Sequence, residues 1–265
     1  MLVTLLTDFG TADYYVAAMK GVILSRDPRI RLVDVSHDVP PHDVRAGAFT
    51  LMAVHRTFPP GTIHVGVVDP GVGSARRPIL AIAGGQLFVG PDNGLFSHVL
   101  DREPHPRVVH LSDPGFFRHP VSPTFHGRDV FAPVAAALAT GTDPGAMGEE
   151  ITDFVRLDPI APRRDPDGGV RASVVHVDRF GNCVTGISRD DLPPGAGGRG
   201  IRVEIGGREI RVLRRYFAEE GAEEGELFAI WGSAGLLEIA ADRDSAARRL
   251  GVRPGDPVRL LPLPR

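Results

Sequence analysis

The chain has 265 residues, a formal net charge of −3 at pH 7 and one cysteine, Cys183; this length suits one large domain or two smaller ones. The balanced charge, without a basic tract, argues against a nucleic-acid partner, and the lone cysteine excludes an internal disulfide or a multi-cysteine metal site. No stretch reaches the roughly 18 apolar residues of a membrane span, so the composition predicts a cytoplasmic protein without a membrane partner.

Residues 1–158 alternate between strand and helix patterns, and we predict one α/β domain there. The strands are expected over 2–6, 30–35, 63–68, 79–83 and 87–89, and the helices over 14–25, 43–57 and 130–139. Asp13 is placed to cap the first helix, and Gly84-Gly85 to turn a hairpin between the fourth and fifth strands. Strands that alternate with helices are typical of a doubly wound, mostly parallel sheet.

The pattern changes after residue 158. Residues 159–169 are rich in proline, glycine, aspartate and arginine, and we predict that they form a linker. Short strands without long helices follow in residues 170–265, over 172–177, 201–205, 210–213, 227–230, 236–240 and 258–261. This spacing predicts a smaller C-terminal antiparallel β-barrel or sandwich domain.

A polar motif follows the strand expected at 63–68. Asp69 comes directly after this strand, Pro70-Gly71-Val72-Gly73 bends the chain, and Arg76 lies seven residues beyond Asp69. Ligands of open α/β sheets bind beyond the carboxyl ends of the strands, so this carboxylate and guanidinium could together orient a small polar molecule such as water. An ordinary Asp-Pro-Gly turn is the alternative interpretation.

Three further polar residues of the first domain stand at element ends. Asp8 follows the first strand, where a carboxylate can accept hydrogen bonds from the two hydroxyls of a ribose, and Asp13 lies just beyond it. Their alternative roles are a turn and a helix cap. His126 directly precedes a helix, whose N-terminus lowers the pKa of an imidazole, although a lone loop histidine is more often only solvated.

Two turns of the second domain carry candidate binding groups. In the segment from Asp178 to Asn182, Phe180 could stack on a base and the amide of Asn182 could bind an adenine edge. Ser233, in the segment 231–235, could hold a carboxylate with its hydroxyl and neighbouring backbone amides. A plain turn is the alternative for both segments.

No segment predicts a metal site or a known phosphate-binding loop. His37, Asp38, His42 and Asp43 are close in sequence but lack the spacing of zinc ligands. The glycine-rich signatures of nucleoside triphosphatases and dinucleotide-binding folds and the nucleophile elbow are absent from the sequence. We therefore expect a site without a metal.

Together these segments resemble the S-adenosyl-L-methionine (SAM) hydroxide adenosyltransferases, or SAM hydrolases, which are related to the fluorinase and chlorinase enzymes. The resemblance runs from Thr4-Leu5-Leu6-Thr7-Asp8-Phe9-Gly10 to the final strands, and its most specific parts are 69–76 and 124–129. It implies a larger α/β domain followed by a smaller β domain. It also implies a homotrimer that binds SAM between the N-domain of one subunit and the C-domain of its neighbour, and needs no cofactor.

The resemblance also implies roles for individual residues. Asp69, Arg76 and His126 would form a hydrolytic triad, and Asp8 would hold the ribose hydroxyls. The contacts to the two polar ends of the methionine would come from Asp13, Asp178 and Ser233, and the contacts to adenine from Phe180 and Asn182. The halogenating relatives have an aromatic residue in place of Asp69, lack His126, and carry an arginine at Ala234 and a loop inserted near 84–85. These differences favour water over halide as the nucleophile.

The expected reaction is in-line attack of an activated water or hydroxide on C5′ of the ribose, giving adenosine and L-methionine with inversion at C5′. His126 is the favoured proton acceptor near neutral pH, with the final acceptor left open. Three alternatives stay open: a halide adenosyltransferase on the same fold, a SAM- or adenosine-binding protein without turnover, and a metal-dependent hydrolase using Asp8, His37, Asp69 and His126.

Overall fold

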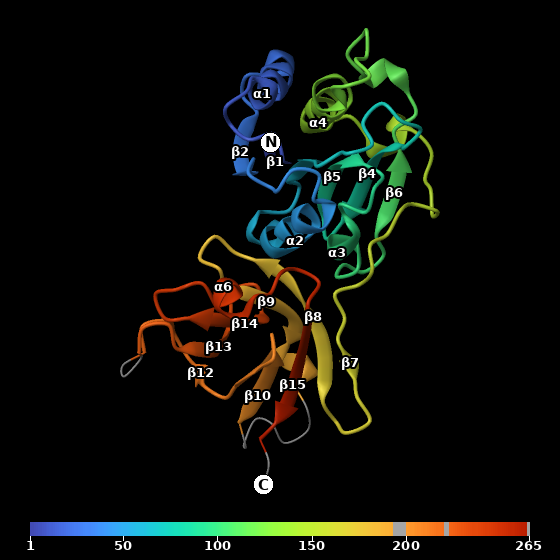
Figure 1. The fold of residues 1–265 in the computed structure, drawn as a ribbon. Helices are drawn as coiled ribbons and strands as arrows, with labels where there is room; N and C mark the ends of the chain where they lie inside the picture. The colour runs from blue at the N-terminus through green and yellow to red at the C-terminus, as the bar shows by residue number, and fades with distance from the viewer. Residues whose placement is uncertain (193–199, 220–222, 264–265) are drawn as a thin grey trace. The chain divides into compact units, whose positions relative to one another are not determined.

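The computed structural model describes residues 1–192, 200–219 and 223–263. The chain divides into two compact units, Met1–Pro159 and Ile160–Arg265, which we describe separately (Figure 1). Among the described residues, no helix has the length and apolar character to cross a membrane. Together the two units form a mixed α/β fold, with a parallel-rich sheet in the first and a curled, mostly antiparallel sheet in the second.

The first unit is built on a six-stranded sheet in the order β2-β1-β3-β5-β4-β6. Its strands are β1 (Leu2–Thr7), β2 (Arg31–Ser36), β3 (Ile63–Val67), β4 (Pro78–Ala83), β5 (Gln86–Pro91) and β6 (Arg107–His110). The first four in spatial order run parallel, whereas β4 is antiparallel to both of its neighbours. The predicted hairpin at Gly84 and Gly85 is confirmed, since it joins β4 to β5 with φ of 57° and 72° at these glycines. Strand β6 was not predicted.

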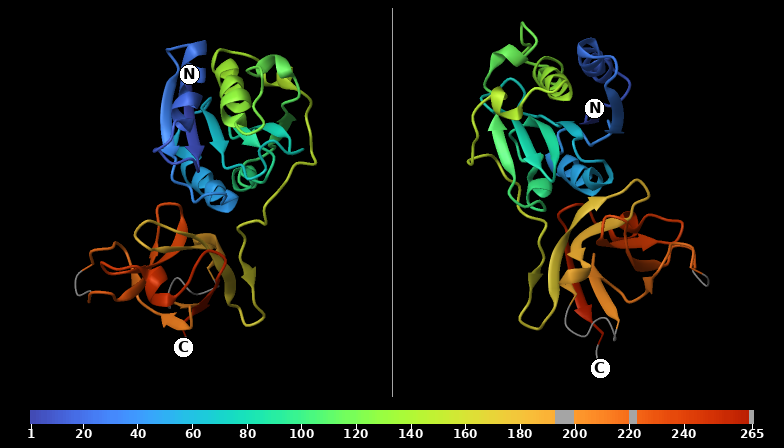
Figure 2. Two further views of the ribbon diagram at one scale, coloured as in Figure 1. Left: turned by 45° about the horizontal axis from the view of Figure 1, so that its top comes forward. Right: turned by 180° about the vertical axis from the view of Figure 1, so that it is seen from behind.

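Helices cover both faces of this sheet: α1 and α4 lie on one side and α2 and α3 on the other (Figures 1 and 2). Their bounds are α1 (Tyr15–Arg26), α2 (Val44–Val54), α3 (Ser97–Leu100) and α4 (Ala132–Ala139). A π-helical turn, Gly127–Phe131, leads into α4, and short 3₁₀ turns occur at His55–Thr57, Pro114–Phe116 and Pro144–Met147. Apolar side chains of α1, α4 and the sheet form a core on one face, and each fully buried leucine or phenylalanine contributes about 1.5–3 kcal/mol.

The start of α1 differs from the prediction. Residue Tyr14, not Asp13, is the N-cap, and no side chain caps the helix there. Asp13 lies one residue too early and is exposed, so its carboxylate is not in the position from which a cap reaches the first free backbone N–H groups. The predicted role of Asp13 as a helix cap is therefore wrong. Asp43, by contrast, caps α2 by accepting a hydrogen bond from Ala46 N at 2.9 Å.

The second unit is a nine-stranded sheet in the order β11-β10-β15-β8-β9-β14-β13-β12, with β7 paired to β8. The strands are β7 (Arg163–Arg164), β8 (Val170–Val177), β9 (Cys183–Ser188), β10 (Ile201–Ile205), β11 (Arg208–Ile210), β12 (Leu213–Arg214), β13 (Leu227–Trp231), β14 (Leu236–Ala241) and β15 (Pro257–Pro262). A 3₁₀ turn at Arg189–Asp191 and the helix α6 (Ala246–Leu250) complete it. All neighbouring pairs are antiparallel except β12 with β13.

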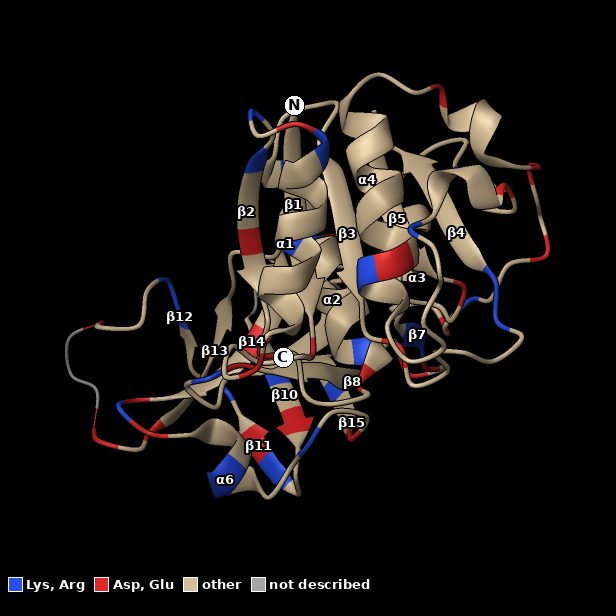
Figure 3. Cartoon of the chain, turned by 90° about the horizontal axis from the view of Figure 1, so that it is seen from above, with Lys and Arg blue, Asp and Glu red and all other residues tan. Residues whose placement is uncertain are grey.

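The two ends of this sheet, β11 and β12, are consecutive along the chain, so the sheet curls back on itself around an apolar core. One predicted strand, 210–213, is wrong, because the chain leaves β10 after Ile210 and joins β13 at Leu213. Strand β9 and helix α6 were not predicted. Arg163 and Arg164, within the segment expected to be a linker, form β7. Acidic and basic residues are interspersed along the ribbon rather than gathered by sign (Figure 3).

Candidate active site

The loop after β3 places Asp69 and Arg76 at the carboxyl edge of the first sheet. Val72 N donates to Asp69 O at 3.2 Å, which closes the turn that follows the strand. Gly73 adopts a φ of 77°, and an added Cβ would lie 2.2 Å from Pro123 O. Only glycine permits this close approach. Gly73 therefore lets the loop after β3 pack against the segment that leads to His126.

Asp69, Arg76 and His126 lie together in one hydrogen-bonded set. Arg76 Nε donates to Asp69 Oδ1 at 2.9 Å, and Arg76 Nη2 donates to Asp69 Oδ2, so the pair is bidentate. The same Nη2 lies 2.7 Å from His126 Nδ1. The side chains of Asp69 and Arg76 are only 4% and 9% exposed, so water screens this ion pair little.

The partners of this set determine where its hydrogens are. A guanidinium only donates, so His126 Nδ1 must accept, and the neutral ring carries its hydrogen on Nε2. Burial and then the charge of Arg76 hold the pKa of His126 below its usual value, against the opposing effects of Asp69 and Asp129. The ring is therefore neutral at pH 7 and presents an N–H at Nε2.

One donor of the set is left over. Arg76 Nη1 is buried and has no hydrogen-bond partner among the residues that the structure describes. An unsatisfied buried donor costs about 1–3 kcal/mol, and more when it is charged. A bound oxygen or another acceptor would remove this cost, so the free N–H points to a ligand at this place.

A second buried carboxylate, Asp129, supports the turn that carries His126. It accepts hydrogen bonds from Arg128 Nε at 2.8 Å, Arg118 Nη1 at 3.1 Å and Ser122 N at 2.9 Å. Burial raises the pKa of Asp129, but these hydrogen bonds outweigh it and lower the pKa to about 2. The sequence did not indicate this group, because Asp129 is buried only by neighbours that the fold brings to it.

Asp8 lies on the same edge of the sheet as the set of three. Thr7 pairs with Val67 in the neighbouring strand. Asp8 and Asp69 therefore both follow the ends of these two paired strands. Its Oδ2 accepts from His42 N at 2.8 Å, and His42 is held at a φ of 67° to present this N–H. Such a conformation costs a non-glycine residue about 1–3 kcal/mol and is found mainly at functional sites.

In the second unit, two of the predicted residues line a pocket of about 520 Å³. Phe180 is 77% exposed, and Asn182 is buried. Gly181 (φ 86°) lets their turn pack on Ser245, since an added Cβ would lie 2.0 Å from Ser245 Oγ. Lining residues that sequence analysis missed, because they come from distant segments, are Phe217, Ala241, Arg243, Asp244, Ser245 and Arg248.

The remaining predicted residues are placed differently. Asp178 accepts hydrogen bonds from Phe180 N at 2.9 Å and from Asn182 N and Nδ2, both at 2.8 Å, so its carboxylate closes its own turn. Ser233 is exposed in the turn before β14, whereas the pocket lies at the other end of that strand. Asp13 is exposed before α1.

A metal site does not emerge from the described part of the chain. No three or more His, Cys, Asp or Glu side chains there are grouped so that they could hold an ion. In particular, Asp8, His37, Asp69 and His126 do not form such a group. The arrangement provides instead N–H donors around a buried ion pair, which suits an oxygen nucleophile or an anion.

Comparison with known proteins identifies the family. Family models described as the SAM hydroxide adenosyltransferase N-terminal and C-terminal domains match residues 3–148 and 172–259. The chain is 43% identical to an (R)-S-adenosyl-L-methionine hydrolase from Thermus thermophilus, over 97% of this chain and 98% of that protein. It is 27% identical to a fluorinase from Actinopolyspora mzabensis, over 98% of this chain and 96% of that protein.

A solved structure of an uncharacterized conserved protein from Thermotoga maritima superposes with a TM-score of 0.88 at 32% identity, covering 98% of this chain and 99% of that one. The two family models together span most of the chain, and the residues 69, 76 and 126 fall within the first. By sequence and by fold, this chain belongs to the SAM hydroxide adenosyltransferase family.

Proposed function

We propose that the protein hydrolyses SAM to adenosine and L-methionine, with no cofactor beyond the substrate. The observation that carries the proposal is the buried set of Asp69, Arg76 and His126, in which Arg76 Nη1 has no partner among the described residues. The name of the Thermus thermophilus relative, (R)-S-adenosyl-L-methionine hydrolase, supports the same reaction.

In the proposed reaction an oxygen nucleophile forms a bond to C5′ while the C5′–S bond breaks. The electron pair of that bond goes to sulfur, so methionine leaves as a neutral thioether and needs no acid. What the site must supply is a nucleophile held in line behind C5′, and such placement can lower the barrier by about 7–11 kcal/mol. The N–H groups at Arg76 Nη1 and His126 Nε2 are suited to hold it.

The protonation of the set favours hydroxide as the species that attacks. The lone pair at His126 Nδ1 is engaged by Arg76, and Nε2 carries a hydrogen, so the neutral ring has no free site for the proton of a water molecule. The geometry therefore disfavours the expected role of His126 as proton acceptor. We propose that the water loses its proton to solvent before attack, and that the two N–H donors stabilise the resulting hydroxide.

The remaining contacts are part of the same proposal. Asp8 would bind the ribose hydroxyls, and the 520 Å³ pocket beside Phe180 and Asn182 would take the adenine. Asp13, Asp178 and Ser233 would bind the methionine ends, although Asp178 must first give up hydrogen bonds within its own turn. Ala234 stands beside Ser233, so the carboxylate contact there would come from the backbone.

We further propose a cytoplasmic homotrimer, in which SAM lies between the α/β domain of one subunit and the β domain of its neighbour. The domain limits are those expected from the sequence, 1–158 and 170–265, with a doubly wound first domain that carries the triad. The second domain would be a small barrel that supplies the adenine and methionine contacts. Support comes from the resemblance and from the pocket in the second unit.

The test is to incubate the protein with SAM in ¹⁸O-labelled water and to weigh both products. We expect the label in the 5′-hydroxyl of adenosine and none in methionine. Label in methionine, or no products at all, would contradict the proposal. Formation of a halogenated nucleoside in chloride or fluoride would instead support a halide adenosyltransferase. Adenosine that co-purifies with the protein, without any product over hours, would support a binding protein.

A further inference from the structure

Beside Asp8, a chain of polar side chains runs from the buried Thr7 to Lys20, the single lysine of the sequence. Thr7 Oγ1 lies 2.9 Å from His37 Nδ1. His37 Nε2 lies 3.1 Å from Asp34 Oδ1, an electrostatic contact that is too bent for a good hydrogen bond. Lys20 Nζ donates to Asp34 Oδ2 at 2.6 Å. The chain thus links the end of β1 to β2 and α1.

The carboxylate of Asp34 indicates how the hydrogens of these side chains are arranged. Thr7 Oγ1 accepts a hydrogen bond from Phe9 N at 3.2 Å and still has its own hydrogen to donate to His37 Nδ1. A carboxylate only accepts, so Asp34 beside Nε2 favours the tautomer that carries its hydrogen there, in which Nδ1 accepts from the Thr7 hydroxyl. Burial raises the pKa of Asp34, but the hydrogen bond from Lys20 and the contact with His37 outweigh it and hold the pKa below its usual value. Asp34 is therefore ionised and orients the imidazole.

The backbone on both sides of Asp8 is tied to this histidine. Thr7, which precedes Asp8, contacts the ring of His37, and Gly10 N donates to His37 O at 2.8 Å. The carboxylate of Asp8 itself is held by His42 N, five residues after His37. The position of the Asp8 carboxylate thus depends on how His37 is held.

A hydroxyl, an imidazole and a carboxylate in a row also occur where a hydroxyl acts as a nucleophile. That role does not fit here, because Thr7 is 0% exposed and His37 is only 5% exposed. A substrate cannot reach the hydroxyl. The set is therefore built to position its neighbours rather than to react.

We propose that His37, oriented by Asp34 and bonded to Thr7, is a positioning residue that holds Asp8 for recognition of the ribose hydroxyls of the nucleoside. This inference rests on the proposed function, in which Asp8 binds the ribose. It assigns to the three side chains an effect on ribose recognition, and no direct part in the chemical step.

The same strand offers a matched control. Thr4 Oγ1 lies 2.7 Å from His64 Nδ1, so β1 carries a second buried threonine–histidine pair. The two threonines are separated by about 10 Å, at 3.3 Å per residue of a strand. The ring of His64 stacks on Phe88, inside the core. Thr4→Val and Thr7→Val therefore remove the same group at equal burial, but only Thr7 adjoins Asp8.

The test compares SAM with 2′-deoxy-SAM in the wild type, Thr7→Val, Thr7→Ser and Thr4→Val. We expect Thr7→Val to raise KM for SAM roughly tenfold, to change kcat less than about threefold, and to lose most of the wild-type preference for the ribose substrate. Thr7→Ser keeps the hydroxyl and is expected to restore the preference. Thr4→Val is expected to lower Tm but to keep KM and the preference.

The inference is overturned if folded Thr7→Val keeps the wild-type preference, or if Thr4→Val loses it equally. Should Thr7→Val not fold, Asp34→Asn replaces it, since Asp34 is the half-exposed member of this row of polar side chains. We expect a smaller loss of preference in that variant, and no loss would overturn the inference. Calorimetry with adenosine and 2′-deoxyadenosine reports ribose recognition without turnover. A wild type that binds both but does not hydrolyse SAM would therefore contradict the proposed function and leave this test intact.

Discussion

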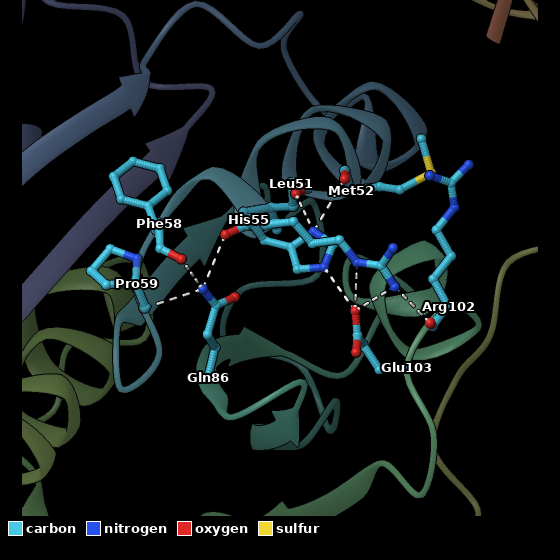
Figure 4. Close-up of polar contacts among 9 residues, drawn as sticks. Leu51, Met52, His55, Phe58, Pro59, Gln86, Arg102 and Glu103 are labelled. Carbon is cyan, nitrogen blue, oxygen red and sulfur yellow. Dashed lines mark hydrogen bonds and ion pairs between the residues drawn. The ribbon is translucent and has the colours of Figure 1, made fainter. Parts of the chain in front are cut away.

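The two edges of the first sheet both bury polar side chains, and they use them differently. At the amino ends of β3 and β5, Gln86 Nε2 donates to the carbonyl oxygens of His55 and Phe58, each at 3.0 Å (Figure 4). His55 Nε2 lies 3.4 Å from Glu103 Oε1, and Arg56 Nε donates to the same oxygen at 2.8 Å. This group, which we call the Gln86 cluster, binds the turn after α2 to the start of β5.

At the carboxyl edge, the set of Asp69, Arg76 and His126 leaves a charged N–H buried and without a partner among the residues that the structure describes. Atoms without a hydrogen bond also occur near the Gln86 cluster, at His64 Nε2 and Gln86 Oε1, but they belong to neutral groups that interact with each other. Buried polar groups alone therefore do not identify a functional site. In the described part of the first sheet, the unpartnered donor of a charged group lies at the carboxyl edge, beside the candidate site.

The largest effect is expected when the set of Asp69, Arg76 and His126 is disrupted. Asp69→Asn removes the charge that orients Arg76, and we expect kcat for SAM to fall about 10²–10³-fold with little change in KM. Steady-state kinetics measure both constants. The control is Glu150→Gln, which weakens the exposed pair of Glu150 with Arg107 and should leave kcat unchanged. An equal rise in KM would show that Asp69 serves binding instead.

The next effect concerns His64. Burial lowers the pKa of this histidine from 6.5 to about 4. The unfolded chain then binds a proton between pH 6.5 and pH 4 that the folded protein does not bind. Stability is full above pH 6.5 and falls as the pH drops toward 4, by up to about 3 kcal/mol. Urea unfolding at several pH values measures this, and His64→Phe should flatten the slope. An unchanged slope in that variant would assign the effect to other groups.

A smaller loss of stability is expected when the Gln86 cluster is disrupted. Gln86→Leu removes the side-chain donor to the carbonyl oxygens of His55 and Phe58, although His55 O keeps its hydrogen bond from Phe58 N, and should lower the free energy of unfolding by about 2 kcal/mol. Because this edge is not the candidate site, kcat and KM for SAM should stay within about twofold at 25 °C. A selective fall in kcat would remove the distinction between the two edges.

The smallest effect is expected at Glu103, at the border of the Gln86 cluster. Its partner Arg56 is 63% exposed, so solvent weakens their ion pair. Glu103→Gln keeps the acceptor oxygen and should lower the free energy of unfolding by no more than about 1 kcal/mol. Chemical denaturation measures this. A loss above that of Gln86→Leu would show that the charge, rather than the backbone hydrogen bonds, holds this edge together.

The order of the main elements and the residues at their ends could be predicted from the amino-acid pattern alone. Strand periodicity and turn residues act over a few positions, so they placed Asp69 after β3, His126 before a helical turn, and the hairpin at Gly84. The motifs at 69–76 and 124–129 were enough to indicate the family. These features are local, and local signals survive without knowledge of the fold.

Which polar groups meet, and which lack a partner, depends on how the chain folds. Arg76 and His126 are 50 positions apart. No spacing in the sequence shows that one guanidinium nitrogen bonds the ring while another has no partner in the described part of the chain. The same holds for the link of Thr7 to His37 across 30 positions. Hydrogen bonds act over about 3 Å, so protonation, orientation and free donors are properties of contacts that the folded chain alone creates.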